Sequence, residues 1–441
     1  MSYANWRRLL VVTAVVLQLL LLFSSCAHGN PTAALSGSSE RFGLRLATNL
    51  GLAQPHSNVA VSPLLLQTAL ALLFAGITPS SAPTAQQLRV ALELQYLGTP
   101  DQALQQFQQL LGNLKQEVAI GCQLRLLSEF YTQQRYTFSF RDEFEARAGT
   151  LGIGVQRLDF NNWASTAQEI NYDFLKRSNY SVGELVSSHL LESSSASDTP
   201  FLHVSALTFR APWAQAFDAQ ETQCINFFPE GSHNAKLVDA MFLQHRFRYA
   251  ELPSLDACAV ELPYATAGLS LLIIYPNQPT GLALLERQLQ RIDLHQLRRM
   301  LSERKMALTL PKFSLLAHTE LRAVLEQLGL SKLFTSEAQL HNVFSSIISS
   351  SAPHLTAVPH SVLFQVDEAG GEAGQTFGKY KVSLGLWNFI FNSRISCSPP
   401  SSVAAFTDLF RSTLSLVINH PFFYAVGNEK TLLLAGHVVD I

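Results

Sequence analysis

The residue types that carry catalytic chemistry are present in this sequence, but none stands in a catalytic pattern. The 441 residues include thirteen histidines, none spaced as metal ligands, and five cysteines. The sequence contains no G-x-S-x-G nucleophile elbow, no H-E-x-x-H metal motif, no phosphate-binding loop and no dinucleotide fingerprint. A lone buried histidine is more often a core residue than a ligand. We therefore expect no enzyme active site, no metal and no cofactor.

The cysteines are far apart and form no C-x-x-C pair, which argues against a zinc site. They are Cys26, Cys122, Cys224, Cys258 and Cys397. Cys26 is expected to leave with an N-terminal signal. The other four could form up to two disulfides in an oxidising compartment. They could equally remain free buried thiols, because a domain of this size needs no covalent cross-link.

The composition describes a large globular protein without a charged partner surface. Hydrophobic residues make up 47% of the chain, charged residues 15%, and the formal net charge is −2. No dense cluster of lysine and arginine occurs along the sequence, so neither nucleic acid nor another polyanion is expected as a partner.

The N-terminus has the pattern of a secretory signal. Arg7 and Arg8 precede the apolar stretch 9–23, and small residues follow, with cleavage plausible after Ala27 or Gly29. Fifteen residues are short for a membrane span of about 20, and no later stretch could cross a membrane. We predict that residues 1–29 are a signal peptide and that the protein is secreted. The sequon at Asn179 predicts a glycoprotein.

The elements that must position any site are helices in the first half and strands in the second. Ser62 as N-cap, Pro63 and Gly76 predict a buried helix over 62–76, and apolar residues at helical spacing predict another over 319–329. Runs rich in β-branched and aromatic residues predict strands at 201–209, 257–264, 269–276, 306–313, 361–366, 414–426 and 431–441. Without repeats or long linkers, the pattern favours one mixed α+β domain.

The stretch "VDEAGGEAG" (366–374) does not fit this pattern. It follows a good strand with two acidic residues and then a run of small residues. Gly370, Gly371 and Gly374 make it a poor strand and a worse helix. It could be a loop in one state and a strand in another.

Seven segments together resemble the serpin superfamily of serine protease inhibitors, in family order across residues 40 to 441. They are 58–92, 201–222, 260–277 ("VELPYATAGLSLLIIYPN"), 308–316 ("LTLPKFSLL"), 325–334, 358–374 ("VPHSVLFQVDEAGGEAG") and 418–440 ("INHPFFYAVGNEKTLLLAGHVVD"). The resemblance implies that residues 30–441 form one serpin domain, which has three β-sheets, eight or nine helices and an exposed reactive loop at about 369–415. It also implies a serine endopeptidase as partner and a monomer.

In inhibitory serpins the target protease cleaves this loop and becomes acylated. The first half of the loop then inserts into the main sheet as a new strand and drags the protease with it. The resemblance assigns the hinge to Glu368, Gly370, Gly371, Glu372 and Ala373. After insertion the inward residues would be Gly371, Ala373, Gln375 and Phe377. Gly371 stands where inhibitors usually carry threonine or serine, Gln375 is an inward amide, and Phe377 is bulky where small residues are usual.

Other positions match the family only in part. Lys312 and Glu368 match an ion pair at the top of the main sheet, and Trp213 matches the tryptophan beside it. Ser62 and His360 match two members of the polar cluster where the sheet parts. There Leu65 replaces a usual serine and Ser205 a usual asparagine.

The loop is longer than the family pattern, with 50 positions from Gly371 to Pro421 (421 − 371). Counting forward from the hinge places the cleaved bond near Leu384-Gly385, and counting back from "NHPFF" places it near Phe410-Arg411. Next to the latter, Arg411-Ser412 resembles a trypsin-type bond. Other candidates for the basic residue before the cleaved bond are Lys379, Lys381 and Arg394. Alternatively, residues 382–401 are a translated intron, which sequencing of the transcript would test.

Two functions remain open on these residues. The first is a secreted inhibitor of trypsin-like serine endopeptidases. The second is a non-inhibitory serpin acting as a binding, carrier or storage protein, which the altered hinge and the long loop favour.

Overall fold

The fold is taken from a computed structural model, which describes residues 31–77, 82–117, 122–134, 139–195, 201–229, 235–266, 268–340, 342–345, 352–370 and 414–441. These residues form ten α-helices. The helices are α2 (Pro31–Ala53), α3 (Pro63–Ala75), α4 (Pro83–Ala91), α5 (Pro100–Glu117), α6 (Asp142–Thr150), α7 (Trp163–Arg177), α8 (Ser188–Ser195), α9 (Leu282–Leu289), α10 (Leu294–Met300) and α11 (Arg322–Gln327).

The strands pair into two sheets. The five-stranded sheet has the order β10-β11-β4-β2-β3, and the nine-stranded sheet has the order β1-β14-β13-β8-β7-β6-β9-β12, with β5 paired to β6. The strands are β1 (Val59–Val61), β2 (Gln123–Gln133), β3 (Gly154–Leu158), β4 (Phe201–Arg210), β5 (Gln223–Phe227), β6 (Lys236–Leu252), β7 (Ala257–Pro263), β8 (Ser270–Pro276), β9 (Ser302–Pro311), β10 (Phe313–Glu320), β11 (Pro359–Val366), β12 (Leu414–Val417), β13 (Phe422–Gly427) and β14 (Leu432–Val438).

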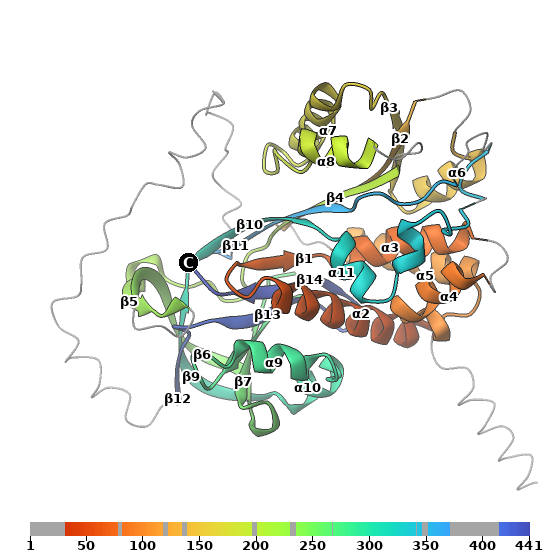
Figure 1. Ribbon diagram of the computed structural model, residues 1–441. Coiled ribbons are helices and arrows are strands. Elements are labelled where there is room, and N and C mark those ends of the chain that lie inside the picture. The colour runs from red at the N-terminus through yellow and green to blue at the C-terminus, as the bar shows by residue number, and fades with distance from the viewer. Residues whose placement is uncertain are drawn as a thin grey trace, which may run out of the picture.

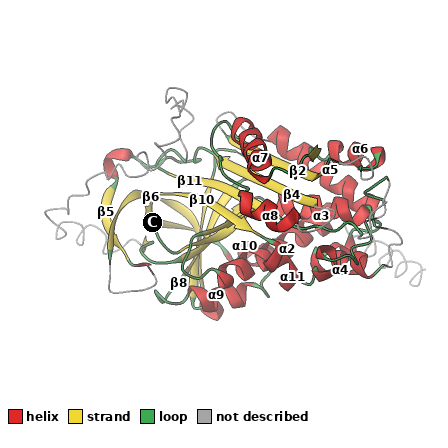
Figure 2. Cartoon of the chain, turned by 45° about the horizontal axis from the view of Figure 1, so that its top comes forward, coloured by secondary structure: helices red, strands yellow, loops and turns green. Residues whose placement is uncertain are grey.

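The predicted fold class is confirmed: helices and two sheets form a mixed α and β architecture (Figure 1). Among the described residues, hydrogen bonding gives two sheets rather than the three that the resemblance implies. The 17-residue β6 pairs with β5, β7 and β9 and so joins two groups of strands into one sheet. The helices α7 and α8 lie over one face of the five-stranded sheet (Figures 1 and 2). Phe174 and Leu191 of these helices pack there against Leu202 and Val204 of β4.

The central strand β4 is buried on both faces, which explains its near-continuous apolar sequence. Phe201, Leu207 and Phe209 face the main core, whereas Leu202 and Val204 face α7 and α8. The buried helix α3 lies beneath this sheet. Its N-cap is Ser62, whose side chain accepts from the Leu65 N–H, as the sequence predicts.

Three predicted boundaries were wrong. The helix over 319–329 begins only at Arg322, because Thr319 and Glu320 complete β10. The strand over 306–313 is two strands in different sheets, with Lys312 at the corner between them. The strand over 414–426 is also two strands, interrupted at 418–421.

Of the two alternatives for the cysteines, disulfides and free thiols, both occur among the described residues. Cys122 and Cys258 carry free thiols, and Cys258 is buried. Burial raises the pKa of Cys258 to about 11, although a hydrogen bond to Tyr249 opposes this. Cys224 is disulfide-bonded.

Candidate functional site: a hinge and the central strands of the main sheet

The two central strands of the five-stranded sheet are parallel neighbours. β11 pairs with β4 from His360 opposite Ser205 to Phe364 opposite Phe209. Both strands run toward the same end of the sheet, where β11 ends at Val366. The chain then turns at 367–370, with the Gly370 N–H bonded to the Asp367 carbonyl at 3.0 Å. This turn is the described part of the hinge.

The hinge is tied to the segment that follows β4. The main-chain N–H groups of Ala211, Trp213 and Phe217 donate to the carbonyls of Gly370, Ala369 and Glu368 at 3.2, 3.1 and 2.9 Å. The indole Nε1 of Trp213 donates to the Asp367 carbonyl at 2.8 Å. Four carbonyls in a row are thus satisfied by one facing segment.

Gly370 is required by its geometry. Its φ is +85°, in the region that favours glycine. A Cβ atom there would lie 2.4 Å from the Ala211 carbonyl oxygen and 2.6 Å from the Trp213 nitrogen. The close approach that permits the hinge hydrogen bonds therefore excludes any side chain at this position.

Glu368 anchors the hinge by charge. Its Oε1 lies 2.9 Å from the Lys312 Nζ and accepts from the Thr222 hydroxyl at 2.7 Å. Burial alone would raise the pKa of Glu368, but the bonds from Thr222 and Lys312 outweigh it and lower the pKa below its ordinary value. The structure thus brings together Lys312 and Glu368, which the sequence paired only by resemblance.

Farther down the central strands lies a neutral polar cluster. The Ser62 main-chain N–H donates to Nε2 of His360 at 3.0 Å, so this nitrogen carries no proton. The proton of the neutral ring is therefore on Nδ1, 2.8 Å from the Ser205 hydroxyl. Burial, reinforced by His203, lowers the pKa of His360 to about 3. The serine that replaces the usual asparagine at 205 thus still pairs with His360.

A second histidine in this cluster was missed at the sequence level. His203 lies on the same face of β4 as Ser205, and its Nε2 is 2.9 Å from the Ser128 hydroxyl of β2. Its buried Nδ1 has no partner among the described residues. Burial lowers the pKa of His203 to about 3. The two-residue spacing to Ser205 could have indicated it, since alternate strand residues share a face.

Trp213 has a structural role as well as a hydrogen bond. Its ring stacks on Tyr264, with 4.5 Å between ring centroids and 7° between planes, and meets Phe217 edge-on. Leu65, where the resemblance expects a serine, is buried in the core and adds no side-chain hydrogen bond to the cluster.

Several predicted site residues lie outside the described residues. These are Gly371, Glu372, Ala373, Gln375, Phe377, Lys379, Lys381, Leu384, Gly385, Arg394, Arg411 and Ser412, together with the segment 382–401 and the signal peptide. Asn179 is described: it is exposed just beyond α7 and has a φ of 58°.

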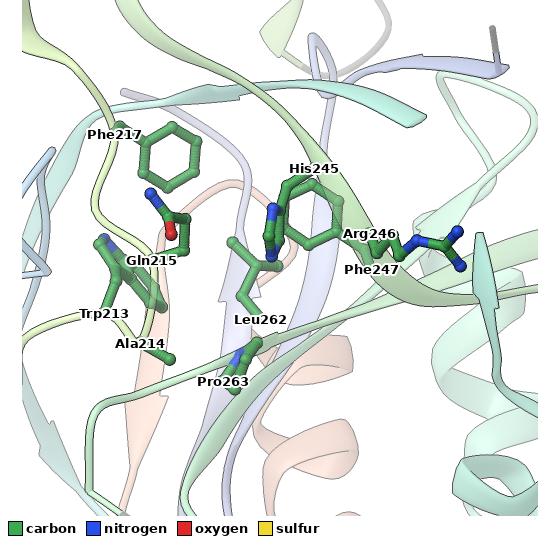
Figure 3. Close-up of a pocket in the computed structure, with 9 residues that line it drawn as sticks. All are labelled: Trp213, Ala214, Gln215, Phe217, His245, Arg246, Phe247, Leu262 and Pro263. Atoms are coloured by element: carbon green, nitrogen blue, oxygen red, sulfur yellow. The ribbon is translucent and has the colours of Figure 1, made fainter. Parts of the chain in front are cut away.

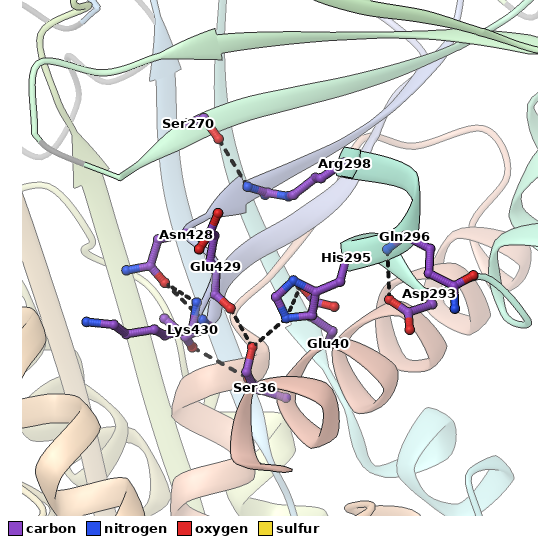
Figure 4. Close-up of polar contacts among 12 residues, drawn as sticks. Ser36, Glu40, Ser270, Asp293, His295, Gln296, Arg298, Asn428, Glu429 and Lys430 are labelled. Atoms are coloured by element: carbon purple, nitrogen blue, oxygen red, sulfur yellow. Dashed lines mark hydrogen bonds and ion pairs between the residues drawn. The ribbon is translucent and has the colours of Figure 1, made fainter. Parts of the chain in front are cut away.

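A serine, a histidine and a carboxylate also meet near the start of α2, but not as a catalytic triad (Figure 4). Ser36 Oγ lies 2.9 Å from Nε2 of His295, yet it donates its own proton to the Glu429 carbonyl at 2.6 Å. Glu40 lies 3.8 Å from the same Nε2 rather than behind Nδ1. The histidine can neither take the serine proton nor be oriented by the acid as a base requires. Within the described parts of the chain, no three metal-ligating side chains gather.

Comparison with known proteins agrees with this geometry. The family profile "Serpin (serine protease inhibitor)" matches residues 37–441. The chain belongs to the serpin family. It is 26% identical to Serine protease inhibitor 42Dd of Drosophila melanogaster over 401 residues, which cover 89% of this chain and 93% of the relative.

Solved serpin structures have the same fold. Serpin48 of the insect Tenebrio molitor superposes with a TM-score of 0.75 at 23% identity, covering 92% of this chain and 98% of that one. Human thyroxine-binding globulin in complex with thyroxine superposes with a TM-score of 0.74 at 18% identity, covering 93% of this chain and 99% of that one. The fold is thus shared by a serpin described as highly specific and by a globulin that binds thyroxine.

Proposed function

We propose that this protein is a secreted inhibitor of trypsin-like serine endopeptidases. It acts by cleavage of the loop, acylation of the protease and insertion of the loop into the five-stranded sheet, which is the main sheet of the family. The observation that carries the proposal is the parallel β4–β11 pair with the hinge at its end. A strand that continued from the hinge and ran back between these two strands would be antiparallel to both. One parallel pairing would become two antiparallel ones, which are slightly more stable per residue.

The hinge contacts suit such a step. Most are main-chain hydrogen bonds, and each contributes only about 0.5–1.5 kcal/mol net. Their loss is small beside the gain from a new central strand. The name of the Drosophila relative, a serine protease inhibitor, supports the same activity.

The trypsin-like preference rests on Arg411-Ser412, and a decisive experiment follows from it. The mature protein is incubated with trypsin, with a chymotrypsin-type and with an elastase-type protease. We expect an SDS-resistant complex with trypsin, lost in Arg411→Ala and kept in the matched control Lys381→Ala. Mass spectrometry of the cleaved loop assigns the bond. Clean cleavage without a complex would contradict the inhibitor function.

A second candidate is a non-inhibitory binding or carrier protein. It is favoured by Gly371, Gln375 and Phe377 in the expected insertion strand and by the long loop. Glycine weakens a strand, and an unpaired inward amide costs about 1–3 kcal/mol. A loop-cleaved form that gains no thermal stability would favour this candidate, because an inserted strand stabilises the sheet.

Secretion has a separate test. We expect the full chain, expressed in cultured animal cells, to appear in the medium with a new N-terminus after Ala27 or Gly29. A glycan on Asn179 would be lost in Asn179→Gln. No described helix is long and apolar enough to span a bilayer. Retention of the uncleaved chain in membranes would contradict secretion.

A further inference from the structure

A small cavity lies beside the segment that holds the hinge. Its volume is about 120 Å³, and it is lined by Trp213, Ala214, Gln215, Phe217, His245, Arg246, Phe247, Leu262 and Pro263 (Figure 3). Ala214, Gln215, His245 and Pro263 are exposed, so the cavity is reached from solvent on their side. An engineered apolar cavity of roughly 150 Å³ binds benzene, so this volume is of the order of one aromatic ring.

The walls present aromatic surface. Tyr264 covers one face of the Trp213 indole, at 4.5 Å, and the cavity lies beside the rest of the ring. Phe217 meets Trp213 at 71°, and His245 meets Phe247 at 82°, so two edge-to-face ring pairs line the space. Such offset and edge-to-face arrangements are the ones that aromatic rings prefer.

The polar groups select a neutral ligand. No carboxylate lines the cavity, and the Arg246 guanidinium points away from it (Figure 3). The Gln215 amide lies on the side of Trp213, and the His245 imidazole lies on the side of Phe247. Neither has a hydrogen-bond partner in the described parts of the chain. Together they can hold one hydroxyl or amide group.

Two wall residues are also the residues that hold the hinge. Trp213 donates to Asp367 and Ala369, and Phe217 donates to Glu368. A ring packed against these side chains would restrain them in the position that the hinge hydrogen bonds require. Binding and hinge closure must then favour each other reciprocally.

We propose that this cavity binds a neutral, single-ring aromatic molecule with one hydrogen-bonding group, and that the bound ring holds the hinge closed. The proposal goes beyond protease inhibition, because binding needs no protease and no cleavage of the loop.

Phenol is the probe, and binding to the intact protein is followed by calorimetry or by ligand-observed NMR. We expect saturable binding at one site. Cyclohexanol, which keeps the hydroxyl but has no aromatic face, should bind about 2- to 10-fold more weakly. Gln215→Met, which keeps the length but removes the amide, should weaken phenol by about the same factor.

Ala214→Leu is the blocking variant, because an added side chain at this exposed position fills the cavity while the Ala214 N–H still donates to the Pro263 carbonyl. The matched control is Ala216→Leu, two residues on and outside the lining. We expect Ala214→Leu to lose phenol binding and Ala216→Leu to keep it. Equal binding by wild type and Ala214→Leu, or no saturable binding by wild type, would overturn the site.

Coupling to the hinge is read by amide hydrogen exchange at Trp213 and Phe217. If hinge opening releases the ligand, phenol at ten times its Kd slows exchange through that opening about tenfold. In Ala214→Leu it should have no effect. Unchanged exchange at saturating phenol in the wild type would overturn the coupling. None of these readouts depends on whether the protein inhibits a protease.

Discussion

Two regions hold β4 and β11 together, the hinge at their C-terminal end and the polar cluster around His203 and His360, and they do so by different chemistry. At the hinge, the Lys312–Glu368 ion pair is partly exposed to water, and main-chain hydrogen bonds join the half-buried residues 367–369 to the segment after β4. Near the start of β11, His360 and His203 are fully buried, neutral and bonded to serines. Groups at the hinge can exchange their partners for water at little cost. The buried histidines of the polar cluster would lose their serine partners if β4 and β11 separated. The hinge and the polar cluster should therefore respond to different changes of residue and pH.

The largest expected effect is the response of the polar cluster to acid. Both histidines have pKa values lowered to about 3, below the ordinary 6.5 that they regain on unfolding. The unfolded chain therefore binds more protons, and stability that is complete above pH 6.5 is lost as the pH falls toward 3. At pH 5 the loss is on the order of 2 kcal/mol for each histidine.

Urea unfolding of wild type and His203→Leu at pH 7.5 and pH 5.0 measures this loss. The variant should lose on the order of 2 kcal/mol less than wild type over this interval, because one of the two histidines is gone. His189→Leu is the control, since His189 is exposed and should leave the difference unchanged. An identical pH response in His203→Leu would show that His203 is not neutral in the folded protein.

The next largest effect is expected from a substitution that disturbs the backbone of the hinge and leaves its charged side chains unchanged. Gly370→Ala should destabilise the closed turn by about 1–3 kcal/mol, because its φ is positive and the Cβ would meet the Ala211 carbonyl. Gly112→Ala in α5 is the matched control: a Cβ there meets nothing within 4 Å and should stabilise the helix by about 0.5–1 kcal/mol. Exchange at the Ala211 and Trp213 amides should speed up only in Gly370→Ala. Equal behaviour of the two variants would argue against the close approach.

The smallest effect concerns the hinge ion pair. Glu368→Gln keeps an oxygen for the Thr222 hydroxyl but loses the charge that faces Lys312, and should cost about 1 kcal/mol or less. Because the pKa of Glu368 is lowered, its contribution is present above its ordinary pKa of about 4.5 and is lost as the pH falls below it.

Wild type and Glu368→Gln should thus differ at pH 7 and converge only as the pH falls below 4.5, a lower window than that in which the histidines begin to respond. Glu337→Gln, in the exposed pair with Lys332, is the control and should change little. A Glu368→Gln variant whose difference from wild type vanished already at pH 5 would erase the contrast between the hinge and the polar cluster.

Much of the fold could be predicted from local pattern. The helix from Pro63 and the apolar strands from Phe201 and Leu432 begin within two residues of their expected positions, since cap residues and buried β-branched runs act locally. The misplaced start of α11 shows the limit. Thr319 and Glu320 are compatible with a helix in the sequence pattern, but in the structure their backbone pairs with β11 instead.

The site could be predicted only in part, and only through resemblance. That route indicated five residues, which the structure brings together at the hinge or at the polar cluster of β4 and β11: Lys312, Glu368, Trp213, Ser62 and His360. It did not indicate His203, Ser128 or Thr222. These residues come from strands and turns far apart in sequence, and no pattern along one segment records which side chain another segment will bring to it.

By itself, the sequence determined the strand and helix types, the need for a flexible residue at Gly370 and the family, because each depends on residues close along the chain or on their order. The tertiary structure alone decided that β4 and β11 lie side by side and that Trp213 and Phe217 both hold the hinge and wall a cavity. It also decided the protonation of the two histidines. The cost of a charge depends on how completely other segments exclude water, and that exclusion exists only once the chain has folded.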